Sequence, residues 1–151
     1  MKQATLVIAM LVSVTASATP VAEQKKRTAV DDTLAKSAED IKDCGKKFTV
    51  AFDWKAYDAL DWKAIGREKA DTYSTEESNL RHVGEGVNKV CADKDYKVAL
   101  GKISTIVYRS TNDTTIRVKA VVSGSTLVLE NYTFGSTRGA SDYETAIKAG
   151  M

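Results

Sequence analysis

The chain contains one histidine, the side chain that most often serves as a general base. His82 has Ser78 four residues before it and Glu85 three residues after it. Side chains at these spacings meet on one face of a helix, so the three residues match the nucleophile, base and orienting carboxylate of a hydrolase triad. A triad also needs oxyanion donors and a substrate cleft, and the sequence has no G-x-S-x-G turn. The pattern therefore favours a solvated helix face over a catalytic site.

The tetrapeptide DWKA is a second candidate for chemistry, because it occurs twice and holds both tryptophans of the chain. The two copies are residues 53–56 and 61–64. Aromatic rings stack on sugars, and glycoside cleavage requires a pair of carboxylates. The acids near the repeat are Asp53, Asp58, Asp61, Glu76 and Glu77. The repeat leaves open a hydrolase that acts on cell-wall sugar or peptide.

Helix capping explains the same repeat without a ligand. An aspartate at the start of a helix accepts hydrogen bonds from the free amides of the first turn, and its charge suits the positive helix end. Each aspartate of the repeat is followed by three residues compatible with a helix. We therefore predict two short helices that begin after Asp53 and Asp61, with Trp54 and Trp62 closing one end of the core.

Metal ligands and cofactor motifs are sparse in the sequence. With one histidine and two distant cysteines, no zinc-binding spacing occurs. The D-x-D at residues 93–95 lacks the glycine and the terminal glutamate of a calcium loop. The G-x-G at residues 84–86 lacks the third glycine of a dinucleotide-binding loop and falls within a predicted helix. We predict neither a metal nor a cofactor.

Charge gives no sign of a nucleic-acid partner. The formal net charge is +2, and the one concentrated basic run is residues 25–27. A nucleic-acid-binding domain usually shows a larger basic surplus or a basic stripe. The run lies in a polar segment, residues 19–30, that we expect to be a flexible lead-in.

The first eighteen residues match a secretory signal peptide. Lys2 is followed by an apolar run over residues 6–14 and by Ala16-Ser17-Ala18, a small-x-small cleavage signal. The apolar run is shorter than the roughly 20 residues that span a bilayer, and no later segment approaches that length. The sequence predicts export to the periplasm or the medium, with cleavage after Ala18.

Two cysteines, Cys44 and Cys91, are present. An exported chain meets an oxidising compartment in which disulfides persist. We predict one intramolecular bridge between them, which would join the ends of two helices.

Hydrophobic periodicity predicts a single α+β domain over residues 31–151. A three-to-four spacing indicates helices near residues 31–44 and 74–91, and alternation indicates a strand at 47–53. Three further alternating runs between residues 104 and 134 are separated by short polar turns, which is typical of an antiparallel meander. We expect two layers, with helices packed on a mostly antiparallel sheet. Glycines at positions 84 and 86 predict a close approach of another backbone to their helix.

These features favour a small exported protein that binds a protein partner, as an inhibitor or an accessory envelope factor. Besides the hydrolase, a small-ligand carrier with a pocket between helices and sheet is an alternative. Two stretches are candidate contact surfaces: the DWKA segment, and the strand and loop from 132 to 138, with side chains expected to point outward. The candidate residues are Trp54, Tyr57, Trp62, Tyr132, Phe134 and Arg138. The sequence does not determine the oligomeric state.

Overall fold

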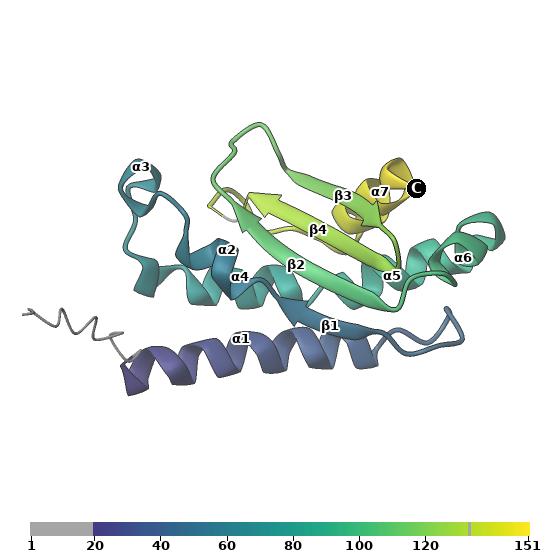
Figure 1. Cartoon of the computed structure of the whole chain (residues 1–151), viewed down its shortest axis with the longest axis horizontal. Coiled ribbons are helices and arrows are strands. Elements are labelled where there is room, and N and C mark those ends of the chain that lie inside the picture. The colour runs from purple at the N-terminus through teal and green to yellow at the C-terminus, as the bar shows by residue number, and fades with distance from the viewer. Residues whose placement is uncertain (1–19, 133) are drawn as a thin grey trace, which may run out of the picture.

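A computed structural model describes residues 20–132 and 134–151, so the expected signal peptide lies outside the described residues. A four-stranded sheet lies in front of helices α4, α5 and α7, and α1 runs beside its β1 edge (Figure 1). The elements are α1 (Val21–Glu39), β1 (Thr49–Phe52), α2 (Trp54–Asp58), α3 (Trp62–Ile65), η1 (Lys69–Asp71), α4 (Tyr73–Leu80), α5 (Val83–Ala92), α6 (Lys94–Leu100), β2 (Thr105–Thr111), β3 (Val118–Ser123), β4 (Thr126–Tyr132) and α7 (Ala140–Gly150). The chain forms one small α+β domain, as predicted.

The order of the strands corrects the expected meander. The sheet runs β1-β2-β4-β3, with β1 parallel to β2, β2 parallel to β4, and only β3 antiparallel to β4. The connection over residues 112–117 carries the chain past one strand position, so β3 takes the outer edge and β4 returns beside β2. The helices between β1 and β2 provide the long crossover that parallel strands require. The sheet is therefore mixed rather than mostly antiparallel.

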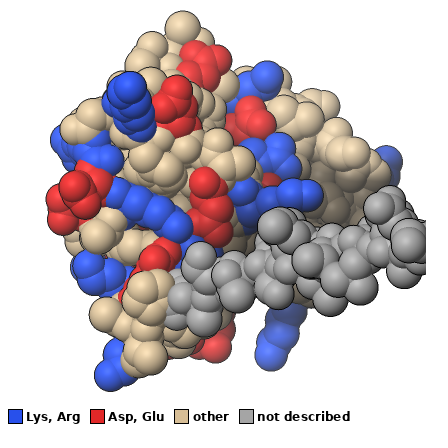
Figure 2. Space-filling view, turned by 60° about the vertical axis from the view of Figure 1, so that its left-hand side comes forward, with Lys and Arg blue, Asp and Glu red and all other residues tan. Residues whose placement is uncertain are grey.

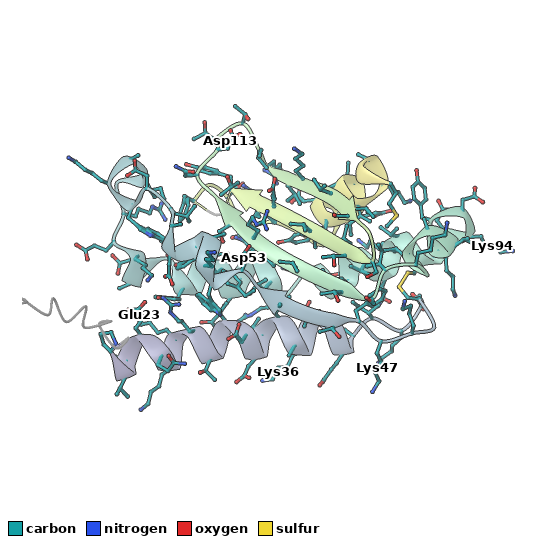
Figure 3. All side chains as sticks on the ribbon, in the orientation of Figure 1. Glu23, Lys36, Lys47, Asp53, Lys94 and Asp113 are labelled. Atoms are coloured by element: carbon teal, nitrogen blue, oxygen red, sulfur yellow. A yellow bond between two sulfur atoms is a disulfide. The ribbon has the colours of Figure 1, made fainter. Side chains whose placement is uncertain are left out.

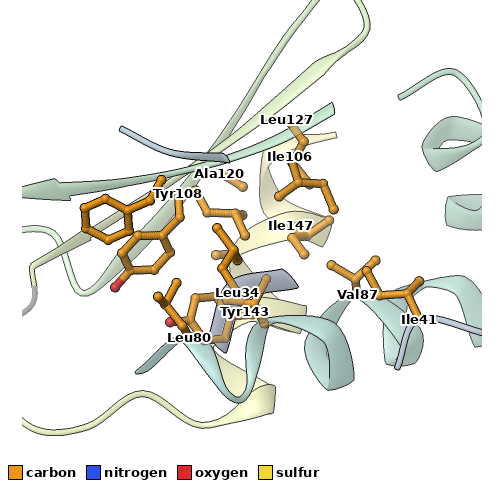
Figure 4. Packing of buried hydrophobic residues seen from close by; sticks show 14 of the residues in the cluster. Leu34, Ile41, Leu80, Val87, Ile106, Tyr108, Ala120, Leu127, Tyr143 and Ile147 are labelled. Atoms are coloured by element: carbon orange, nitrogen blue, oxygen red, sulfur yellow. The ribbon is translucent and has the colours of Figure 1, made fainter. Parts of the chain in front are cut away.

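The core lies between one face of this sheet and the helices (Figure 4). Burial alternates along β2 and β4, with every second residue buried. The buried strand residues Ile106, Tyr108 and Leu127 meet Val87 of α5 and Ile147 of α7 in one apolar cluster. One face of the sheet is thus packed, and its other face is left without a helix layer.

The segment expected to be a flexible lead-in is a helix. The first helix begins at Val21 rather than near residue 31, and it ends at Glu39. Its first turns are held by ion pairs: Arg27 donates to Asp58 at 2.6 Å, and Lys69 lies 2.9 Å from Glu23. Basic and acidic side chains alternate over this end of the molecule (Figure 2). Partners from distant parts of the chain hold a segment whose local sequence is mostly polar.

Both predicted links to α5 are present. Cys44 and Cys91 form a disulfide with a Cα–Cα distance of 5.0 Å, although Cys44 follows the end of α1 in a loop. A side chain at Gly84 would overlap the Ser37 carbonyl of α1, and one at Gly86 would lie 2.6 Å from Cβ of Tyr143. The glycines therefore let α1 and α7 approach the backbone of α5. In the described part of the chain no helix has the length and apolar character needed to cross a membrane.

The contact at Gly84 predicts a loss of stability on adding one methyl group. Gly84→Ala should lower the free energy of unfolding by at least about 2 kcal/mol through overpacking, although alanine favours a helix by up to about 1 kcal/mol. Gly135→Ala is the matched control, since its new methyl group would make only ordinary contacts. Urea unfolding of both variants measures the difference. Equal stabilities would contradict the close α1–α5 packing.

The ion pairs on α1 predict a dependence of stability on acid. Hydrogen bonds from Lys69, Arg27 and Tyr73 lower the pKa of Glu23 from 4.5 to about 2. The folded-state pKa lies below the unfolded one, so the stabilisation is present above about pH 4.5. It should be lost as the pH falls toward 2. The difference in unfolding free energy between wild type and Glu23→Gln should shrink over that interval, and a constant difference would contradict the assignment.

Candidate interaction surface

Each copy of DWKA begins a short helix, as predicted. The Asp53 carboxylate accepts a hydrogen bond from the Ala56 amide at 3.0 Å, and Asp61 accepts one from Ala64 at 3.0 Å. Gly66 ends the second helix with a φ of 68°, a left-handed conformation that suits glycine. Capping therefore accounts for both aspartates of the repeat.

The acids of the repeat are engaged in structure, which weakens the hydrolase alternative. The second oxygen of Asp53 accepts from Nε of Arg109 at 2.9 Å (Figure 3 labels Asp53). Burial raises the pKa of Asp53, but the Ala56 amide and the Arg109 guanidinium outweigh it and hold this pKa below its ordinary value. Burial likewise raises the pKa of Asp58, and its bonds to Arg27 and Lys69 lower it overall. A general acid for glycoside cleavage needs a raised pKa instead.

The Ser78–His82 pair is not assembled for catalysis. The Ser78 hydroxyl donates to the Ser74 carbonyl at 3.0 Å. Nδ1 of His82 lies 3.9 Å from Glu85, and both side chains are well exposed. In the described residues, histidine, cysteine and acidic side chains form no group of three that could hold a metal.

A depression near α1 differs from the pocket expected of a small-ligand carrier. It has a volume of about 360 Å³ and lies at the surface between α1 and η1. Charged side chains border it, among them Glu23, Lys26 and Lys69. The pocket of a carrier was expected between helices and sheet, and this depression lies outside that layer.

The two candidate stretches meet in one aromatic cluster. The Trp62 ring lies 4.9 Å from Tyr57 and 5.8 Å from Phe134, and Phe134 lies 5.6 Å from Tyr132. Trp54 joins the cluster through Tyr57, with ring centroids 5.5 Å apart. Segments far apart in the sequence thus form one continuous aromatic cluster at the end of the sheet.

Burial divides these residues into two groups and corrects part of the expected surface. Tyr57, Phe134 and Arg138 are buried, with exposed fractions of 0%, 8% and 3%. Trp54, Trp62 and Tyr132 remain half-buried and reach the surface. Phe134 and Arg138 were expected to point outward and instead belong to the packed interior.

Arg138 is buried because the end of β4 offers it several acceptors. Its guanidinium donates to the Asn131 side chain at 2.9 Å and to the carbonyls of Arg117 at 3.1 Å and Tyr132 at 2.5 Å. Hydrogen bonds of this kind offset the cost of removing a charge from water. The side chain therefore fastens the loop after β4 and is not available to a partner.

The two tryptophans of the repeat are fixed differently. Nε1 of Trp54 donates to Asp31 of α1 at 3.0 Å, and the Arg27 guanidinium lies 4.8 Å above its ring. Nε1 of Trp62 is sheltered from solvent and has no hydrogen-bond partner among the described residues. Helix α3, which carries Trp62, projects from the body of the molecule in Figure 1. Trp54 is tied to α1 by a side-chain hydrogen bond, whereas among the described residues the Trp62 side chain is held by packing against neighbouring rings and the core.

The sheet face without a helix layer, called the open face here, meets the aromatic cluster at Tyr132. Its side chains form rows that run across the strands. The strand register places Ala51, Val107, Val128 and Val121 side by side in an apolar row across the four strands. A hydroxyl row lies on one side of it: Thr49, Thr105, Thr126 and Ser123. On its other side lies a charged row: Asp53, Arg109, Glu130 and Lys119. The sequence shows the alternation within each strand, but the rows exist only once the strand order is known.

No protein-family model, curated protein or solved structure matches the chain. Function is therefore inferred from the surface itself.

The capping roles predict different costs for the two aspartates. Asp61→Ala should lower the free energy of unfolding by about 1 kcal/mol, the usual value of an N-cap. Asp53→Ala should cost more, because Arg109 also loses one of its two carboxylate partners, and Asp53→Asn should cost less than Asp53→Ala because asparagine still caps α2. Urea unfolding of the three variants tests this order. A smaller loss for Asp53→Ala than for Asp61→Ala would contradict it.

Proposed function

We propose that the chain is an exported protein-binding module, acting as an inhibitor or an accessory envelope factor, with Trp62 as its central contact residue. The difference between the two tryptophans supports this proposal. Trp62 repeats the motif of Trp54 but lacks the hydrogen bond that fixes Trp54 to α1. Tryptophan and tyrosine are enriched among the residues that carry most of the energy of protein interfaces.

The surroundings of Trp62 also suit a contact surface. The Tyr57 and Phe134 rings pack against the Trp62 ring. Tyr132 contacts Phe134 and lies at the border of the open sheet face. An aromatic anchor that is already packed loses little side-chain entropy on binding.

The disulfide supports export. Bridges such as Cys44–Cys91 persist in the periplasm and outside the cell, and they are rare in the reducing cytosol.

The test is affinity capture with the oxidised protein, using envelope and culture extracts of the source cells. Trp62→Ala should lower the affinity for the captured protein by about tenfold or more, as expected for a central aromatic contact. It should leave the disulfide and the circular dichroism spectrum intact. The affinity is measured by calorimetry with the purified partner.

Trp54→Ala is the matched control from the same motif. It should lower the melting temperature, because it removes the Asp31 bond and the Arg27 contact, and change the affinity much less. If Trp62→Ala binds the captured protein as well as wild type does, Trp62 is not the contact residue and the proposal fails.

A further inference from the structure

The charged row on the open face alternates in sign across the sheet. In the spatial order β1, β2, β4, β3 its members are Asp53, Arg109, Glu130 and Lys119. Within the row, Arg109 contacts Asp53 at 2.9 Å and Glu130 at 3.4 Å, and Lys119 is registered directly opposite Glu130. The order of signs is therefore minus, plus, minus, plus.

Read from the opposite edge of the sheet, the row has the opposite sign at every position. The charges are therefore antisymmetric about the midline between β2 and β4. A two-fold axis along that midline, parallel to the strands, would place β1 over β3 and β2 over β4 of a second molecule. Asp53 would then face Lys119 of the second copy, and Arg109 would face Glu130. Every charge in the row would meet the opposite charge, which is the complementarity that selects a partner at an interface.

We propose that the open face pairs with the same face of a second copy of this chain, forming a sandwich of two four-stranded sheets with the helices outside. Two-fold pairing of one surface with itself is the commonest arrangement of protein dimers. Sheets packed in this way lie about 10 Å apart with their strands within about 30° of each other. Arginine and glutamate side chains are long enough to meet across that gap.

The apolar row and the hydroxyl row are also complementary to themselves about this two-fold axis. Val107 would face Val128 of the second copy, and Ala51 would face Val121, so the apolar row would be buried against itself. Val121 has 38% of its surface exposed, which makes it one of the more exposed large apolar residues of the described chain. The hydroxyl row would face hydroxyls, which can both donate and accept.

Two other arrangements fit less well. An in-plane axis perpendicular to the strands would exchange the two outer rows, so charges would face hydroxyls. Pairing through the free edge of β3 is hindered by α7, because Gly150 lies so close to Ala120 that a Cβ there would overlap the Ala120 carbonyl. The face, rather than the edge, is the self-complementary surface.

The size of the surface indicates a reversible dimer. Four strands at about 4.8 Å and three rows at about 6.6 Å cover roughly 400 Å² on each copy. Stable interfaces bury about 800 Å² on each partner. The dimer should therefore be weaker than one with an interface of standard size, and it should dissociate on dilution.

Sedimentation velocity over a concentration series tests this with two charge reversals. Arg109→Glu and Glu130→Arg should each weaken self-association by at least about tenfold, because like charges would face each other across the axis. An equimolar mixture of the two variants should restore dimers. One variant has two acidic side chains at these positions and the other has two basic ones, so the axis would bring opposite charges together. Lys94→Glu is the matched control, an exposed charge reversal on α6 that should leave association unchanged.

Restoration in the mixture cannot arise from misfolding, so it supports the proposal directly. A wild type that stays monomeric at every concentration would overturn it. Dimers that survive both reversals, or folded variants whose mixture does not associate, would overturn it as well. The inference does not rest on the proposed function, because Trp62→Ala should retain dimers while losing the captured partner.

Discussion

The Asp53 carboxylate links the two halves of this molecule. One oxygen caps α2 and directs the chain out of the sheet, and the other holds Arg109 on the neighbouring strand. Arg109 in turn contacts Glu130, so the charge order of the open face begins at a helix cap. A residue without a side-chain acceptor at this position, such as alanine, would release both the start of the helical crossover and the end of the charged row. The hydrogen bonds that lower the pKa of Asp53 also keep it ionised in both roles.

A second set of polar contacts holds the opposite face of the sheet. The Glu76 carboxylate lies in the core with the Ser110 hydroxyl at 2.5 Å, and Asn79 accepts from the Arg138 amide at 2.7 Å. These hydrogen bonds connect α4 to the end of β2 and to the loop that follows β4. Buried polar groups of this kind are costly unless they are paired. The loop after β4 is therefore part of the scaffold, and the Arg138 side chain within it is not available to a partner.

The doubled DWKA motif shows how one local sequence acquires two roles. Both copies form the same cap and the same short helix, because capping depends only on neighbouring residues. Trp54 falls beside Asp31 and Arg27 of α1 and becomes part of the packing. Trp62 falls at the end of the sheet, beside Phe134, where no acceptor for its indole is present among the described residues. The distinction between a structural and a contact tryptophan thus arises from what each one meets.

Features that depend on near neighbours or on covalent chemistry could be read from the amino-acid order. The two caps follow from aspartate before a helical run, the alternation along β2 and β4 follows from their side-chain pattern, and the only two cysteines of the chain predict their own bridge. The strand order came from the folded chain, because alternating runs look the same in parallel and antiparallel sheets. The helix over residues 21–30 and the burial of Arg138 were also seen only in the folded chain. Asp58 and Lys69, which hold the start of α1, lie far away in sequence, and Asn131 takes its position beside Arg138 only in the folded sheet. The charged row required all of these placements together, because its order of signs exists only when four separate strands lie side by side.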